Sequence, residues 1–93
     1  MIKVNEYFDG NVKSLGLENA EGRETVGVMA AGEYEFGTST IEFMTVISGS
    51  LTVMLPGETT WKTFMPFQTF MVPKGAKFRL RLEEDAAYKC LYM

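Results

Sequence analysis

Short runs of alternating apolar and polar residues, separated by glycine and proline, recur along the whole chain. Glu42–Ser48 and Leu51–Leu55 are two such runs, and Gly49-Ser50 lies between them. Two β-rich runs joined by two residues that include glycine predict a hairpin. Glycine at the first central position suits a type II′ turn, because that position requires a positive φ angle. Residues 32 to 57 therefore form the centre of the predicted fold.

Seven further runs have the composition of strands. Lys77–Leu82 alternates most regularly, with Phe78, Leu80 and Leu82 on one face and basic residues on the other. The other six are Val12–Leu17, Thr25–Met29, Glu33–Phe36, Trp61–Phe64, Thr69–Val72 and Ala87–Tyr92. Residues 1 to 10 could add a first strand or a single helical turn. No run shows a 3.6-residue apolar period with caps, so no helix is predicted elsewhere.

The segments between these runs complete the prediction. The polar residues Glu18–Gly22 predict a loop, and Gly27 inside an apolar run predicts a bulge or a close approach by another group. About nine short strands with frequent turns predict an all-β fold, an antiparallel sandwich or a jelly-roll barrel. The length predicts a single domain over residues 1–93.

Composition and charge exclude several classes of function. The chain is 46% hydrophobic and 23% charged, which is typical of a globular protein. Its net charge of −3 gives no electrostatic reason to expect nucleic acid or an anionic membrane as a partner. No apolar run approaches the ~20 residues needed to span a bilayer, and the first residues lack the features of a signal peptide. The single cysteine, Cys90, allows no internal disulfide, which is typical of the cytoplasm.

The chain contains no histidine. This removes the histidine-dependent catalytic pairs and the commonest ligand of transition metals. No clustered acidic motif indicates a magnesium site, so we expect no metal cofactor. Cys90 has no histidine to activate it, and its apolar neighbours predict a buried, unreactive side chain.

Two short motifs resemble those of the cupin family. Glu42, followed after six residues by Gly49, resembles the second half of the first cupin motif. Pro73-Lys74-Gly75, with Phe78 two residues further on, resembles the core of the second motif. The histidines that usually bind metal in both motifs are missing, and Phe78 stands where the second motif has its histidine. The resemblance implies a metal-free, RmlC-like cupin barrel.

Longer segments carry a more specific resemblance. NEYFDGNVKSLG at residues 5–16, GRETVGVMAAGEYEF at 22–36 and EFMTVISGSLTVMLPG at 42–57 resemble the small cupins of the pyrimidine/purine nucleoside phosphorylase family. The similarity runs from about residue 5 to the C-terminus. It implies phosphorolysis of ribonucleosides to free base and ribose 1-phosphate, with broad base tolerance, by a cytoplasmic homodimer. Its partners would be a nucleoside and inorganic phosphate as co-substrate, with no cofactor.

Phosphorolysis needs groups that hold phosphate, bind the ribose and help the base to leave. If the cupin register holds, Glu42 points into the barrel and binds ribose hydroxyls or stabilises positive charge on the sugar. The alternative is a glutamate that faces water. Arg23 is the phosphate candidate, because a guanidinium group binds phosphate through two donors. The alternative is an ion pair of Arg23 with Glu21 or Glu24.

Other side chains are candidates for contact with the substrate, although turn chemistry, β-propensity or core packing is the simpler explanation of each of them. Hydroxyl groups could bind ribose or phosphate, and aromatic rings could stack on a base because every base has a π-face. The hydroxyl candidates are Thr38, Ser39 and Thr45; the aromatic candidates are Phe36 and Phe78, as pocket walls, and Tyr88.

The apolar run Phe67–Val72 predicts association, because an exposed strand edge of this kind would otherwise aggregate. We expect a homodimer that buries part of this edge or the hairpin face.

Two alternative functions stay open at this point. The first is an epimerase-type, metal-free cupin acting on a sugar or nucleotide sugar, for which Tyr88 or Tyr92 would have to serve as acid or base. The second is a non-catalytic cupin that binds a sugar or a nucleotide. Composition and spacing alone indicate a β-barrel with one acidic residue inside it.

Overall fold

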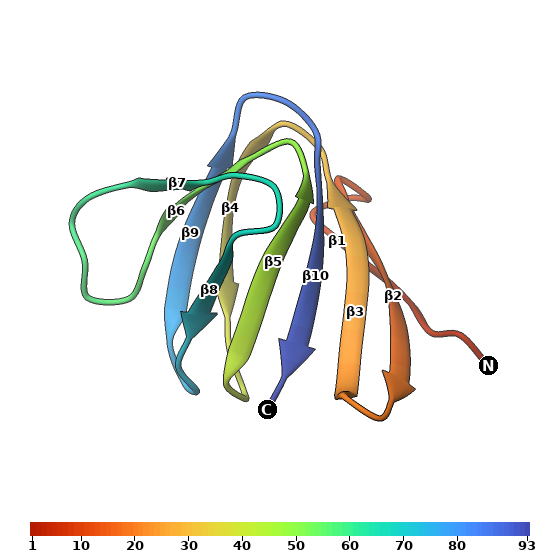
Figure 1. The fold of residues 1–93 in the computed structure, drawn as a ribbon. Coiled ribbons are helices and arrows are strands. Elements are labelled where there is room, and N and C mark those ends of the chain that lie inside the picture. The colour runs from red at the N-terminus through yellow and green to blue at the C-terminus, as the bar shows by residue number, and fades with distance from the viewer.

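The computed structural model describes all 93 residues and contains ten strands and no helix (Figure 1). No helix therefore exists that could cross a membrane. The strands are β1 (Val4–Tyr7), β2 (Val12–Asn19), β3 (Gly22–Met29), β4 (Gly32–Gly37), β5 (Glu42–Ser48), β6 (Leu51–Met54), β7 (Lys62–Phe64), β8 (Thr69–Val72), β9 (Lys77–Leu82) and β10 (Ala86–Tyr92). The all-β prediction is confirmed.

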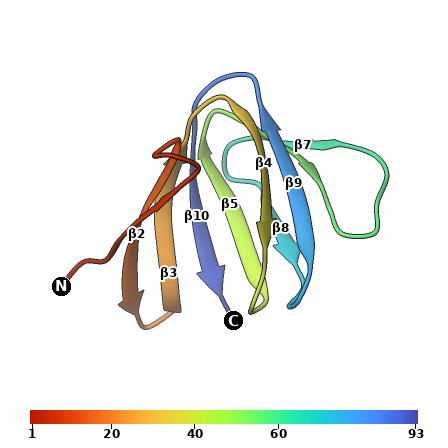
Figure 2. The ribbon, with the colours of Figure 1, turned by 180° about the vertical axis from the view of Figure 1, so that it is seen from behind.

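The strands form two antiparallel sheets that face each other. The six-stranded sheet has the order β1-β2-β3-β10-β5-β8, and the four-stranded sheet has the order β4-β9-β6-β7. Alternate residues of each strand point between the sheets, where 15 buried side chains form one core. On the side of β2 and β3 the larger sheet extends past the smaller one (Figure 2).

The predicted hairpin across Gly49 is wrong. β5 pairs with β10 and β8, whereas β6 pairs with β9 and β7 in the other sheet. Gly49 still has a positive φ of 77°, and a Cβ there would lie 2.8 Å from the carbonyl oxygen of Asp85. Glycine is needed here because two connections between the sheets cross at this corner. Alternating patterns look the same in a hairpin and at such a corner.

The predicted loop Glu18–Gly22 is also wrong. β2 and β3 stay paired as far as Asn19 and Gly22, which leaves a turn of two residues. The backbone N–H of Glu21 donates to Asn19 Oδ1 across this turn, at 2.9 Å. Polar side chains on the exposed end of a hairpin have the composition of a loop, so composition could not separate the two. Arg23 consequently lies within a strand.

Candidate active site

A cavity of about 250 Å³ lies between the two sheets. Its lining combines eight hydrophobic residues with a few polar groups, a composition typical of sites for small molecules. Most of the lining comes from the six-stranded sheet, and β4 with β9 closes the opposite side. The lining residues are Tyr7, Ser14, Met29, Phe36, Gly37, Ser39, Glu42, Met44, Phe78, Tyr88, Cys90 and Tyr92.

Glu42 begins β5 and places its carboxylate at the cavity, where the cupin register predicts it. The Cys90 thiol on β10 donates to Glu42 Oε1 at 3.5 Å, and no lysine or arginine forms an ion pair with Glu42. Burial raises the pKa of the Glu42 carboxyl, and the hydrogen bond from Cys90 offsets part of this shift. A carboxylate without a cation, facing an open cavity, is available to the hydroxyls or the positive charge of a ligand.

Strand β10 contributes three lining residues in alternation, Tyr88, Cys90 and Tyr92. Burial, followed by the nearby Glu42 charge, raises the pKa of the Cys90 thiol, so the thiol stays protonated and acts as a donor. Burial raises the pKa of Tyr88 to about 12 and also raises the pKa of Tyr92. Both phenols are therefore neutral donors near pH 7.

Aromatic rings form the wall opposite Glu42. The Phe36 and Phe78 rings stack with their centroids 5.9 Å apart, and Tyr7 meets Phe36 edge-on at 6.1 Å. Phe8 adds a second edge contact to Phe36 at 5.3 Å, from outside the cavity lining. The structure thus brings both predicted wall residues, Phe36 and Phe78, to the cavity.

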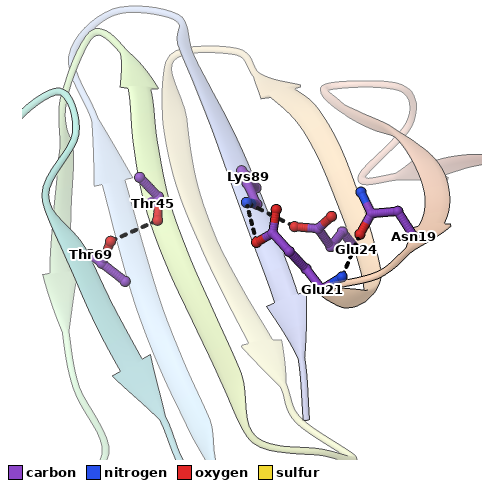
Figure 3. A network of polar contacts seen from close by, with 6 residues as sticks. All are labelled: Asn19, Glu21, Glu24, Thr45, Thr69 and Lys89. Carbon is purple, nitrogen blue, oxygen red and sulfur yellow. Dashed lines mark hydrogen bonds and ion pairs between the residues drawn. The ribbon is translucent and has the colours of Figure 1, made fainter.

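Arg23 lies beside the lining. It is exposed, and its guanidinium carbon is 5.4 Å from the centre of the Tyr92 ring. Glu21 and Glu24 do not pair with it: both bind the Lys89 ammonium, at 3.2 and 2.8 Å, on the outer face of the sheet (Figure 3). Glu24 Oε2 is buried and has no polar partner other than Lys89. Arg23 therefore stays available at the rim of the cavity.

Two of the predicted hydroxyl contacts lie elsewhere. Thr38 Oγ1 donates to the Pro73 carbonyl at 2.6 Å and accepts from the Ala76 N–H at 3.0 Å, so it holds two loops together. Thr45 is three residues after Glu42 and therefore points to the opposite face of β5, where its hydroxyl meets that of Thr69 at 2.7 Å (Figure 3). Ser39 does line the cavity.

Several lining residues were not among the predicted contacts of a nucleoside. Tyr92 was named only as an acid or base of the alternative epimerase, although the alternation along the last strand places it on the same face as Tyr88. Ser14 and Tyr7 carry no such signal, because only the order of strands in the sheet brings them to the cavity. No group of three His, Cys, Asp or Glu side chains has the geometry to hold a metal ion.

The two facing antiparallel sheets and the cavity between them give the chain a cupin-type fold. An RmlC-like cupin from Shewanella frigidimarina superposes with a TM-score of 0.75 at 18% identity, over 96% of this chain and 80% of that one. A protein of unknown function from Vibrio parahaemolyticus superposes more closely, with a TM-score of 0.96 at 43% identity, over 100% of this chain and 99% of that one.

The sequence comparisons are more specific. The sequence model of one family, described as pyrimidine/purine nucleoside phosphorylase, matches residues 2–92. A protein of that name from Tolumonas auensis is 59% identical over 92 residues, which cover 99% of each chain. The chain therefore belongs to the pyrimidine/purine nucleoside phosphorylase family, as the resemblance of its longer segments predicts.

Proposed function

We propose that the protein cleaves purine and pyrimidine ribonucleosides by phosphorolysis, giving the free base and ribose 1-phosphate. Membership of the nucleoside phosphorylase family supports the reaction. The observation that carries the assignment to this cavity is the Glu42 carboxylate, which lacks a cation and faces a stacked aromatic wall.

The aromatic wall suits the base. Phe36 and Phe78 offer flat apolar surface and no hydrogen-bonding group, so they would bind any base through its π-face. This absence of polar selection on the wall is the physical reason for proposing broad base specificity.

Glu42 suits the sugar. In phosphorolysis a phosphate oxygen bonds to C1′ as the bond from C1′ to the base nitrogen breaks, and the electron pair leaves with the base. Positive charge develops on the sugar in such a transition state. A fixed carboxylate in a site of low polarity stabilises that charge more strongly than water would. The ionised form of Glu42 is therefore the active form.

Arg23 suits the phosphate. Its guanidinium stacks on the lining residue Tyr92 and carries no ion pair within the protein. Arg79 and Arg81 are less suitable, because they stack on Trp61 at 5.5 and 4.5 Å on the outer face of β9. Phosphate bound at Arg23 would enter the cavity next to Glu42, since Tyr92 pairs with both residues across the sheet.

The reaction needs no resident cofactor in this scheme. Phosphate is itself the nucleophile, and no protein group has to form a covalent bond. We propose a metal-independent reaction for this reason. An epimerase-type reaction is less well supported, because it would require Tyr88 or Tyr92 to act as a base, and burial raises the pKa of both phenols.

The proposed assembly is a homodimer in the cytoplasm. The outer face of the six-stranded sheet exposes Leu15, Val26 and Val28 side by side on β2 and β3, and Ile47 and Met71 on β5 and β8. Exposed apolar side chains of this kind, here on both sides of the Lys89–Glu24 ion pair, are typical of an interface between subunits. Light scattering should give twice the chain mass for the wild type and the chain mass for Val28→Glu, with Thr63→Glu on the other sheet as control. A monomeric wild type would contradict this assembly.

The function is tested by incubating purified protein with uridine and with adenosine, with and without phosphate, in the presence of a metal chelator. We expect base release from both nucleosides only when phosphate is present. A Glu42→Gln variant purified in the same way controls for contaminating phosphorylases. Release that does not depend on phosphate, or no release, would refute the proposal.

A further inference from the structure

Four residues form a row across the inner face of the larger sheet. Asn5 on β1 pairs with Ser14 on β2, Ser14 pairs with Gly27 on β3, and Gly27 pairs with Tyr88 on β10. Residues directly opposite one another in a sheet point to the same face. Ser14 and Tyr88, which both line the cavity, are thus separated only by a residue without a side chain.

Position 27 requires glycine, because any side chain there would lie too close to its neighbours. A Cβ there would lie 2.7 Å from Tyr88 Oη and 2.7 Å from the Lys13 carbonyl oxygen, distances that real Cβ atoms do not show. The pairing of β3 with both neighbours continues through Gly27 without a bulge. The predicted close approach at Gly27 is therefore that of the Tyr88 phenol, which lies flat across β3 towards β2.

The row also brings the Ser14 and Tyr88 hydroxyls to the same cavity. The Asn5 amide donates to Ser14 Oγ at 3.2 Å, which holds the Ser14 side chain on this face of the sheet. Ser14 lies close enough to the phenol to offset part of the effect of burial on the pKa of Tyr88. Beyond Ser14 the Tyr88 hydroxyl has no protein partner, so its hydrogen is available to a ligand in the cavity that both residues line.

We propose that Tyr88 donates a hydrogen bond to the departing base, and that Gly27, Ser14 and Asn5 are positioning residues that hold the phenol for this role. The proposal rests on the proposed function and names the group that assists the leaving base. As the bond from C1′ breaks, the base takes the electron pair, and a neutral phenol stabilises the resulting negative charge on a base oxygen or nitrogen. The base then takes a proton from water, and Tyr88 keeps its own.

Two features distinguish Tyr88 from Tyr92. The Tyr92 hydroxyl already shares a hydrogen bond with Thr25 Oγ1 at 2.9 Å, and its ring lies beneath Arg23, where phosphate is placed. Tyr88 is buried, whereas Tyr92 on the same strand is half-buried. A hydroxyl that can rotate suits broad specificity, because purines and pyrimidines both present acceptor atoms but at different positions.

The test compares the loss of kcat caused by Tyr88→Phe on two nucleosides with different leaving groups. We expect kcat for uridine to fall roughly 10- to 100-fold, the range for losing a hydrogen bond to a charged group. The loss should be much smaller for 7-methylguanosine, whose base leaves without negative charge and needs no donor. Ser14→Ala should show the same selectivity with a smaller loss. Tyr34→Phe removes a buried hydroxyl outside the cavity, bonded to the Ala30 carbonyl at 2.6 Å, and should show none.

The outcomes separate this inference from the function itself. An active wild type whose Tyr88→Phe variant retains full activity, or loses the same factor on both nucleosides, would overturn the role of Tyr88 alone. A wild type inactive on every nucleoside would overturn both proposals.

Discussion

Replacing Gly27 by alanine tests the close contact on which the position of Tyr88 depends. The added Cβ would lie 2.7 Å from Tyr88 Oη, 2.8 Å from Tyr88 Cε1 and 2.7 Å from the Lys13 carbonyl oxygen. Neither partner can withdraw easily, because one is backbone in a paired strand and the other is a ring buried in the core. The new methyl group therefore overpacks the sheet from two sides.

The magnitude follows from two opposing effects. Overpacking a core by one methyl group costs about 1–3 kcal/mol, whereas alanine in place of glycine stabilises by about 0.4–1 kcal/mol through the unfolded chain. We expect a net loss of about 1–2 kcal/mol, which lowers the melting temperature of a domain of this size by roughly 4–16 °C. Thermal unfolding followed by circular dichroism measures this shift directly.

Gly16 provides the matched control. It lies in the neighbouring strand β2, has no positive φ, and a Cβ there would meet Lys3 atoms at 3.7 and 3.8 Å, which is ordinary contact. Gly16→Ala should therefore leave the melting temperature unchanged or raise it. In a Tyr88→Ala background, Gly27→Ala should cost less than in the wild type. An equal cost in both backgrounds, or a Gly27→Ala variant as stable as the wild type, would refute the reasoning.

Three further variants test the cavity. Glu42→Gln should lower kcat at least 100-fold, which is the scale of removing an electrostatic contact to the transition state. The activity of the wild type should rise as the pH passes through the raised pKa of Glu42, because the ionised form is active. The same variant should not lose stability at pH 7. Because the pKa of Glu42 is raised in the folded state, the wild type becomes less stable as the pH rises from the ordinary glutamate pKa through the folded-state pKa, and glutamine removes this loss. A marked drop in the melting temperature of Glu42→Gln would contradict this prediction. Arg23→Ala should raise the KM for phosphate roughly 10-fold or more, while the KM for nucleoside changes little, because the Arg23 guanidinium is proposed to contact phosphate and not the nucleoside. Equal effects on the KM of both substrates would show that Arg23 is not part of the phosphate site. Thr45→Val should keep wild-type kinetics, because Thr45 faces away from the cavity towards Thr69, and a large kinetic loss would show that the site extends beyond the cavity.

Many of the strands could be predicted, because the alternation of apolar and polar residues is contained within each strand. Glu42–Ser48, Thr69–Val72 and Lys77–Leu82 are observed with the predicted bounds. The pairing of strands could not be predicted in the same way, because a hairpin and a crossing between sheets place the same demands on residues near Gly49. The positive φ at Gly49 was foreseen; its neighbours, Asp85 and Ala86, come from the far end of the chain.

The cavity shows the same division. The positions of Glu42 and Phe78 followed from the cupin motifs, which carry information about which face of each strand is inside. Phe36 was predicted only as an aromatic ring that could form a pocket wall. Thr45 lies three residues after Glu42, so the alternation along β5 places the two side chains on opposite faces of the sheet. This alternation alone would have excluded Thr45 from the cavity. Ser14 could not be found from the sequence, since its closeness to Tyr88 depends on the strand order β2-β3-β10 and on the missing side chain of Gly27.

The most direct test of the account is the appearance of ribose 1-phosphate, followed by phosphorus NMR, when the purified protein is incubated with phosphate and either uridine or adenosine. The account predicts that the wild type forms this product from both nucleosides and that Glu42→Gln, folded and equally stable, forms it at least 100-fold more slowly, as expected for a lost transition-state contact. No ribose 1-phosphate from the wild type, or equal rates for the two proteins, would contradict the claim that Glu42 in this cavity supports phosphorolysis.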